Sequence, residues 1–187
     1  MSTPRHSDSS AVLGGSLLLA HPSLREETFK HTVILIASHD AEGAMGVVLN
    51  RPLDKRLGEL NAEFGMSALA QVPLFEGGPV QPTQVILCVW RPHPEQDGFQ
   101  LMFGIDPQKA EELMNEEGVH LRAFLGYAGW TGGQLEDEMR RDTWVISPLV
   151  ADLLEDTPSE QLWRDLLSQL DDEWKLLANE PEDPSLN

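Results

Sequence analysis

Histidine and carboxylate side chains are the first candidates for metal chemistry in this sequence. His21, His31 and His39 are spread over the first apolar segments, and Asp40 directly follows the last of them. Their spacing does not place two ligands on one face of a helix, as in an H-E-x-x-H motif, and it forms no compact facial triad. A site could still assemble from distant segments, but the pattern favours solvated or structural histidines. We therefore predict no metal and no cofactor.

Nucleophilic and acid–base catalysis find no complete set of residues either. G-x-S-x-G is absent, and the single cysteine, Cys88, lies in the apolar run Val85–Trp90. Burial on a strand raises the pKa of a thiol, which makes it a poor nucleophile. Neighbouring carboxylates occur at Glu26-Glu27 and Glu136–Glu138, but in segments typical of the surface, where nothing tunes a pair for proton transfer. We predict no catalytic residue.

The glycine-rich segment Gly126–Gln134 carries the best signal for ligand binding. It runs from the end of a predicted strand into a predicted helix, where unpaired N–H groups and the helix dipole favour an anion. However, no lysine follows the glycines to meet a phosphate, and the acids at 136–138 would repel one. The sequence favours the alternative, a tight turn in which glycine lets the backbone approach closely and Trp130 packs over it.

A second glycine turn, Gly77-Gly78-Pro79, resembles the first, and both could flank Asn50-Arg51-Pro52. Arg51 is the one base in these blocks, so we predict a ligand-binding cleft around it. The candidate residues are Asn50, Arg51, Gly77, Gly78, Gly129, Trp130 and Thr131. Simple binding and catalysis by a small enzyme are alternatives here, because an enzyme needs a deep pocket that holds an acid or base with a strongly shifted pKa.

The apolar pattern predicts the strands that must position these residues. Thr32–Ser38 is apolar on both faces and is therefore predicted to be a central, buried strand. It forms a predicted hairpin with the strand that follows, which Arg51-Pro52 is expected to end. A turn is predicted over 75–80. The predicted strands are 16–20, 32–38, 44–50, 84–90, 99–103, 121–127 and 143–147.

Helix signals lie between these strands. Asp106-Pro107 combines a capping side chain with proline in the first turn, and Thr131–Gln134 and Thr157–Glu160 fit the capping-box pattern. A further short helix is predicted over 56–65. At 187 residues the chain is expected to form a single domain, which we place at 14–170, between a flexible leader at 1–13 and an acidic tail at 171–187.

The predicted C-terminal helix offers a possible contact surface. Leu162, Leu166 and Leu170 form one apolar stripe, whereas Trp163 and Trp174 fall outside it. Tryptophan is enriched at interfaces, so these side chains indicate partner binding or self-association. Packing against the sheet is the alternative, and the pattern favours it.

Charge narrows the range of partners. Lys and Arg total 13 and Asp and Glu total 31, which gives a net charge of −18. Nucleic-acid binding gains affinity by neutralising phosphates with bases, so direct nucleic-acid binding is not expected, and an anionic membrane is disfavoured for the same reason. No apolar run approaches the roughly 20 residues that span a bilayer. One cysteine excludes an internal disulfide, and the cytoplasm is the expected compartment.

Several blocks in matching order resemble one bacterial family. GSLLLAHPSL, TFKHTVILIASHDAEGAMGVVLNRPL, FEGGPV and GYAGWTGGQLEDEM are similar to the YqgE/AlgH family, and the resemblance runs from about Gly14 to Trp163. It implies an α+β fold with a curved, bifurcated mixed sheet, partly closed into a small barrel and surrounded by helices. It implies no established reaction, although some members are described as transcriptional regulators.

Together these observations predict a non-catalytic cytoplasmic protein. It is expected to bind a protein partner or a small ligand and, if it has a role in gene regulation, to act without direct DNA contact. The alternative is a small enzyme with its site at the glycine-rich cleft near Trp130.

Overall fold

The computed structural model describes residues 15–92, 95, 99–149 and 159–170. The predicted leader, the acidic tail, Thr157 of the second capping box and Trp174 lie outside these residues. The domain boundaries therefore stay predictions.

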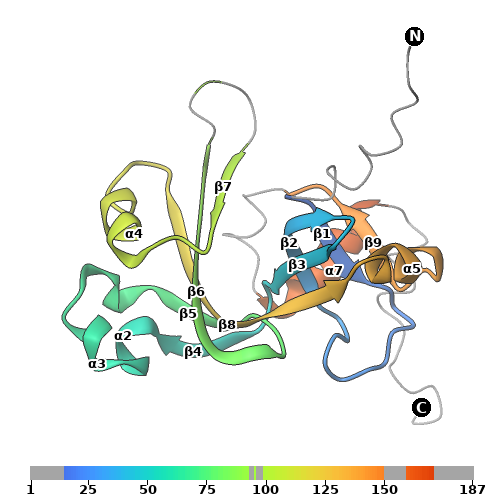
Figure 1. The fold of residues 1–187 in the computed structure, drawn as a ribbon, viewed down its shortest axis with the longest axis horizontal. Helices are drawn as coiled ribbons and strands as arrows, with labels where there is room; N and C mark the ends of the chain where they lie inside the picture. The colour runs from blue at the N-terminus through green and yellow to red at the C-terminus, as the bar shows by residue number, and fades with distance from the viewer. Residues whose placement is uncertain (1–14, 93–94, 96–98, 150–158, 171–187) are drawn as a thin grey trace.

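Within the described residues, nine strands form one mixed sheet that divides at β8 (Figure 1). One half holds β1 (Leu17–Ala20), β2 (Val33–Asp40), β3 (Gly43–Val48) and β9 (Trp144–Ser147). The other holds β4 (Pro52–Arg56), β5 (Pro73–Glu76), β6 (Val80–Pro92) and β7 (Phe99–Phe103). Strand β8 (His120–Thr131) pairs with β3, with β5 in parallel and with β6. The sheet curls into a half-barrel, which confirms the α+β fold with a curved, bifurcated sheet.

Glycines mark the place where the two halves meet. A Cβ atom on Gly77 would lie within 3.0 Å of Gly126 O, and one on Gly126 within 3.0 Å of Gly78 O. Gly126 also has a φ of +73°, a conformation that residues with a Cβ rarely adopt. The backbones of the β5–β6 connection and of β8 therefore touch at a spacing that only glycine allows. The predicted structural role of these glycines, close backbone approach, is confirmed.

Strand β8 is longer than predicted. The sequence predicts a strand at 121–127 followed by a glycine turn, but Gly129, Trp130 and Thr131 continue the strand and pair with Met45, Ala44 and Gly43 of β3. The Thr131–Gln134 pattern is also only half realised. The helix begins after Gly133, and the Gln134 side chain accepts a hydrogen bond from the Thr131 amide at 3.1 Å.

Strand β4 was not predicted. The hairpin strand β3 ends at Val48, before the predicted end at Arg51-Pro52, and Pro52 begins β4, which pairs with β5 through an irregular register. Strand β5 covers the first part of the turn predicted over 75–80. The side chains of β4 are largely exposed, so no apolar pattern announces it, and proline is compatible with the start of an edge strand.

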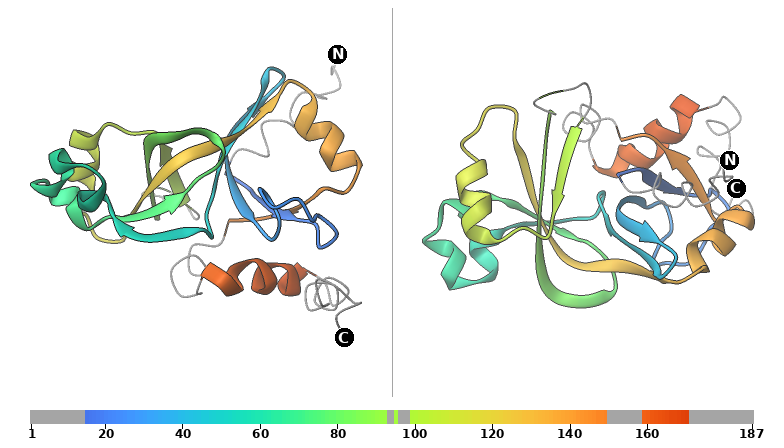
Figure 2. Two further views of the ribbon diagram at one scale, coloured as in Figure 1. Left: turned by 90° about the horizontal axis from the view of Figure 1, so that it is seen from below. Right: turned by 45° about the horizontal axis from the view of Figure 1, so that its top comes forward.

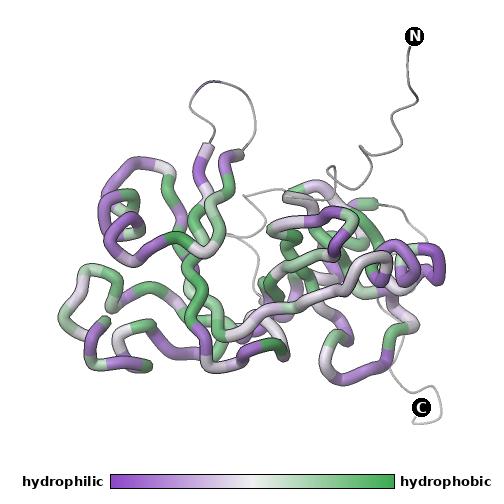
Figure 3. The backbone as a smooth tube through the Cα atoms, in the orientation of Figure 1, coloured by the Kyte–Doolittle hydropathy of each residue, from purple (hydrophilic) through white to green (hydrophobic). Residues whose placement is uncertain are grey.

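Two helices cover opposite faces of the β1–β2–β3 half. On one face α7 (Ser159–Leu170) packs over Leu17, Leu19, Val33 and Leu35. On the other, α5 (Gln134–Arg140) packs over residues that include Leu18, Ile34 and Ile36. Figure 2 shows the two helices on either side of these strands. Both faces are buried there, which explains why β1 and the first half of β2, Val33–Ile36, are continuously apolar (Figure 3).

A third apolar cluster supports the other half. Short helices α2 (Leu57–Leu60), α3 (Ala62–Gly65) and α4 (Pro107–Leu113) and the 3-10 turn η1 (Ala68–Gln71) cover one side of β5, β6 and β8 with residues that include Leu57, Leu69, Ala110 and Ala123. Asp106 caps α4 as predicted, since its side chain accepts from the Gln108 amide at 2.8 Å. None of the described helices is long and apolar enough to span a bilayer.

Helix α7 packs against the sheet, the interpretation that the sequence favoured, but its buried face is broader than the predicted stripe and includes Trp163. Trp163 is a core residue, only 3% exposed; its indole N–H donates to Ala20 O at 2.8 Å, and its ring stacks on His31 at 4.1 Å. Residues one and four apart on a helix share a face when that face is broad, so Trp163 is buried with Leu162, Leu166 and Leu167. Leu170, predicted to face the core, is exposed.

Candidate functional site

The predicted ligand residues fall at two places in the fold. Gly129, Trp130 and Thr131 lie at the end of β8, beside the tip of the β2–β3 hairpin. Asn50 and Arg51 lie in the connection from β3 to β4, and the glycine turn at 77–78 lies against them. The two groups line different hollows in the surface.

The hollow beside the hairpin tip has a volume of about 470 Å³, and we call it the acidic hollow. Two carboxylates, Asp40 and Glu42, stand on one side, and the aromatic and hydroxyl-bearing residues Tyr127 and Thr131 come from β8. The Asp40 side chain accepts from the Glu42 amide at 2.8 Å and so shapes the hairpin tip. The complete lining is Ser38, Asp40, Glu42, Gly43, Ala44, Met45, Val80, Tyr127, Gly129, Trp130 and Thr131, which contains no lysine, arginine or histidine.

Trp130 contributes less to this hollow than the sequence suggests. Only 7% of the residue is exposed, because its ring packs edge-on against Trp144 with the centroids 6.2 Å apart. Both indole N–H groups donate to one oxygen of Glu138, at 3.1 Å from Trp130 and 2.9 Å from Trp144. The predicted packing of Trp130 is therefore seen, but under α5, and little of the ring is left for a ligand.

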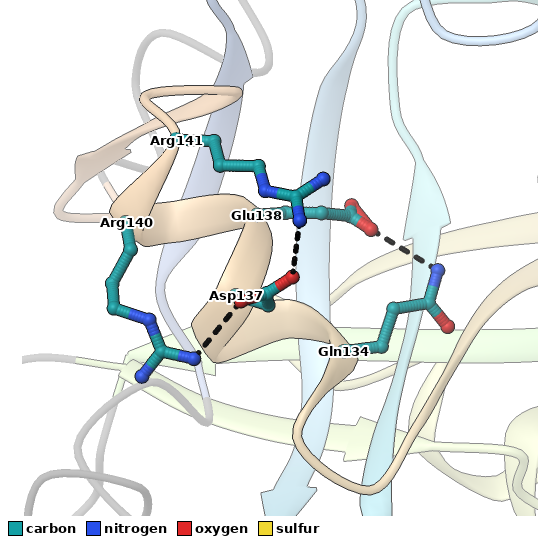
Figure 4. Close-up of polar contacts among 5 residues, drawn as sticks. All are labelled: Gln134, Asp137, Glu138, Arg140 and Arg141. Carbon is teal, nitrogen blue, oxygen red and sulfur yellow. Dashed lines mark hydrogen bonds and ion pairs between the residues drawn. The ribbon is translucent and has the colours of Figure 1, made fainter.

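Polar contacts run along α5, and one of them orients Glu138 (Figure 4). Gln134 donates to the second oxygen of Glu138 at 3.0 Å, and Asp137 bridges Arg140 at 3.0 Å and Arg141 at 3.2 Å. The hydrogen bond from Arg140, followed by the charge of Arg141, lowers the pKa of Asp137. The contacts of Asp137 and Glu138 are therefore with arginine, glutamine and tryptophan side chains, and not with each other.

His39 is a buried histidine whose contact with α5 the sequence did not predict. The register of β2 shifts between Ile36 and Ser38, which turns His39 toward α5, where its ring nitrogen Nε2 contacts the Glu136 carboxylate. A hydrogen bond from its own backbone, and then the contact with His39, lower the pKa of Glu136. The other ring nitrogen, Nδ1, is buried without a hydrogen-bond partner in the described part of the chain. Residues so far apart in sequence give no signal before the fold is known.

Across the described ranges, no group of three His, Cys, Asp or Glu side chains could hold a metal ion. Cys88 is fully buried, and burial raises the pKa of its thiol to about 12 despite the opposing charge of Arg122. The prediction that Cys88 is a buried side chain with a raised thiol pKa is confirmed.

Asn50 and Arg51 connect the β3–β4 segment to the loop before β2. Asn50 donates to His31 O and accepts from the Val33 amide, both at 2.9 Å. The Arg51 guanidinium donates to Thr28 O at 2.5 Å, to Glu27 O at 3.0 Å and to Lys30 O at 3.4 Å. Both candidates therefore have structural contacts, which the sequence did not indicate.

Arg51 also lines two hollows. With Glu27, Glu76 and Gly78 it borders one of about 310 Å³. On the other side it borders a hollow of about 540 Å³ whose basic residues are Lys30, Arg51 and Arg164, which we call the basic hollow. Its complete lining is Lys30, His31, Asn50, Arg51, Ser159, Glu160, Gln161, Trp163 and Arg164.

Several known proteins are similar to this chain in sequence. The model of a family described as AlgH-like matches residues 17–175. A UPF0301 protein of Streptomyces coelicolor is 35% identical over 94% of this chain and 95% of its own. A UPF0301 protein of Chlorobium limicola is 33% identical over 92% of this chain and 95% of its own.

Two solved structures share the fold. The solution structure of the AlgH protein from Pseudomonas aeruginosa superposes with a TM-score of 0.65 at 28% identity and covers 98% of both chains. A crystal structure of a Corynebacterium diphtheriae protein gives a TM-score of 0.70 at 24% identity, covering 89% of this chain and 92% of that one.

Proposed function

This chain belongs to the AlgH-like family, for which no function is established, and we propose that it is a non-catalytic binding protein whose ligand occupies the acidic hollow. The lining of that hollow carries the proposal. Two carboxylates, a tyrosine and a threonine face a space of about 470 Å³ with no basic side chain. Pockets of this size accommodate small organic molecules, and the charge favours a cationic or neutral one.

The positions of the shifted acids and bases support binding over catalysis. Active sites concentrate groups whose pKa values are strongly shifted. Burial or neighbouring groups clearly shift the pKa values of Cys88, Glu136 and Asp137, and none of these three residues lines the acidic hollow. A hollow of backbone, hydroxyl and carboxylate groups supplies contacts and a shape, which is what a binding protein requires.

The same charge argument bears on gene regulation. A net charge of −18 opposes contact with DNA phosphates. We infer that any regulatory activity runs through the bound ligand, or through a protein partner that recognises the hairpin tip. Glu42 and Thr131, both exposed at the rim, are accessible to either.

A thermal-shift screen tests the proposal. The probes are amines, polyamines, nucleosides and neutral sugars at millimolar concentration. A ligand at 100 times its Kd stabilises a protein by about 2.7 kcal/mol, and a chain of this length gains roughly 2–4 °C per kcal/mol. We expect a rise in Tm of roughly 5–10 °C for a true ligand.

Two variants with the same change of charge locate the site. Glu42→Gln removes an exposed carboxylate at the rim, and Glu112→Gln removes an exposed one on α4. The shift should shrink in the first variant and persist in the second. Equal shifts in both variants, or turnover of the bound compound, would overturn the proposal, the latter in favour of an enzyme at the same site. A flat screen would leave a protein partner as the occupant to seek and would refute the small-ligand form.

A further inference from the structure

The basic hollow concentrates positive charge in a strongly acidic protein. Its lining has three bases against one acid, while the whole chain has 13 Lys and Arg against 31 Asp and Glu. The three bases come from three separate segments: Lys30 precedes β2, Arg51 follows β3, and Arg164 lies on α7. The fold, and not a local basic run, brings them together.

The protein itself leaves at least two of these charges without a carboxylate. The three contacts of the Arg51 guanidinium are all to backbone carbonyl oxygens. Neither Arg51 nor Arg164 forms an ion pair within the residues that the structure describes. A guanidinium has five N–H donors. Arg51 already uses three of them on these carbonyl oxygens and contributes mainly its charge, so Arg164 supplies the planar fork that fits an oxyanion. An anion in the hollow would be attracted to the positive charges that line it.

The wall of the hollow is fixed before any ligand arrives. Asn50 ties the connection after β3 to His31 O and to the Val33 amide. The His31 ring stacks on Trp163 with an angle of 21° between the ring planes, and the Trp163 indole is anchored to Ala20 O. Holding His31 at a φ of +57° is costly for a residue with a side chain, and this packing maintains it. A fixed wall lowers the entropic cost of binding.

The first turn of α7 adds to this field. Ser159, Glu160 and Gln161 begin the helix and line the hollow. The N–H groups of a first helical turn have no acceptor within the helix, and their end of the helix dipole is positive. This contribution supplements the three basic side chains.

We propose that the basic hollow, where Lys30, Arg51 and Arg164 converge, binds the phosphate group of a small phosphorylated molecule. Arginine pairs with phosphate through two parallel hydrogen bonds, and lysine supplies a compact charge. A volume of about 540 Å³ exceeds the needs of phosphate alone and leaves space for an organic part. This site is independent of the acidic hollow.

Binding can be measured by two-dimensional NMR of the labelled full-length protein. The probes are inorganic phosphate and glucose 6-phosphate, with sodium chloride at matched ionic strength as control. The salt control is essential because added salt alone screens the charge interactions of a chain with a net charge of −18. We expect saturable shifts with both phosphates below about 10 mM and none with chloride. Shifts of the same size in chloride, or no saturation with either phosphate, would overturn the proposal.

Matched variants locate the site. Arg164→Gln removes an exposed charge from the hollow, and Arg140→Gln removes an exposed one from α5. Because Arg164 is exposed, the variant should fold normally, which its spectrum will show directly. We expect phosphate to bind roughly tenfold more weakly to Arg164→Gln and equally well to Arg140→Gln. Equal affinity in the two variants would refute the assignment to this hollow.

Two further variants separate the two proposals. Lys30→Gln should weaken phosphate binding in the same direction as Arg164→Gln. Glu42→Gln, the rim variant of the acidic hollow, should leave phosphate affinity unchanged. If Glu42→Gln abolished phosphate binding, the anion would be bound elsewhere and this inference would fail, whatever the screen of the acidic hollow had shown.

Discussion

The acidic hollow and the basic hollow are built in different ways. The first is lined by the β2–β3 hairpin and by the end of β8, which pairs directly with it. The second gathers residues from a loop, a strand connection and α7. One depends mainly on paired strands, and the other depends on the docking of α7 against the sheet.

This difference determines how mutations should affect each hollow. Backbone pairing fixes the acidic hollow, so single side chains on its rim can change with little effect on folding. The basic hollow needs α7 in place, and α7 is held by side-chain packing around Trp163. Changes at the sheet junction should therefore disturb both hollows, and changes at Trp163 should disturb only one.

The largest effect is expected at the glycine junction. In Gly126→Ala the new Cβ would meet Gly78 O and Val80 O at a φ of +73°. Both the clash and the backbone strain are unfavourable, so we expect a loss of at least about 3 kcal/mol in the free energy of unfolding. Gly133→Ala is the matched control, because its φ is +82° but no atom lies within 4 Å, and it should cost about 1–2 kcal/mol. Urea unfolding measures both; equal losses would contradict this account of the junction.

The next effect separates the two hollows. Trp163→Ala removes a buried ring, the stack on His31 and the bond to Ala20 O, so we expect a loss of about 3–5 kcal/mol. Trp163→Phe keeps a ring and should lose less. Phosphate affinity should fall in both variants that fold, whereas any ligand of the acidic hollow should bind as before. Loss of both binding activities in Trp163→Phe would show that the hollows are not independent.

Sequence reasoning identified the central strands because they are buried on both faces. Leu17–Ala20 and Val33–Ile36 are apolar at every position, so no partner had to be known to recognise them. Strand β4 escaped detection because its side chains are largely exposed and only its pairing with β5 defines it. The extension of β8 through Gly129 was hidden by glycines that ordinarily mark turns.

For the two hollows, the sequence could single out only those lining residues that stand out in a local pattern. Asn50, Arg51 and the glycine blocks stood out locally, as did the packing of Trp130. Lys30 and Arg164, which complete the basic hollow, are ordinary surface bases until the fold brings them to Arg51. Trp163 was misjudged because the apolar stripe was drawn too narrow for a helix that buries neighbouring positions.

A smaller loss of stability is expected from changes at Glu138 on α5, which accepts a hydrogen bond from Trp130 in the wall of the acidic hollow. Glu138→Ala removes the acceptor of two indole N–H groups, on Trp130 and Trp144. An unpaired buried donor costs about 1–3 kcal/mol, so we expect a loss in that range and a change in tryptophan fluorescence. Glu138→Gln retains an oxygen acceptor and should lose much less. If the two variants were equally destabilised, charge and not hydrogen bonding would be the cause, and α5 would need another explanation.

The smallest expected effect is a pH dependence of stability. It tests whether the contact between Glu136 and His39 holds α5 against β2. The pKa of Glu136 is lowered in the folded protein, first by a hydrogen bond from its own backbone and then by His39. Its ionised form therefore stabilises the fold above the ordinary glutamate pKa of about 4.5, and this stabilisation disappears as the pH falls through the lower folded value. Because the side chain is 39% exposed, solvent screening limits the contribution to less than about 1 kcal/mol. Wild type should be slightly more stable than Glu136→Gln at pH 7, and the difference between their urea midpoints should shrink as the pH falls below about 4.5. A difference that grew as the pH fell would mean that the ionised carboxylate is not what binds α5 to β2.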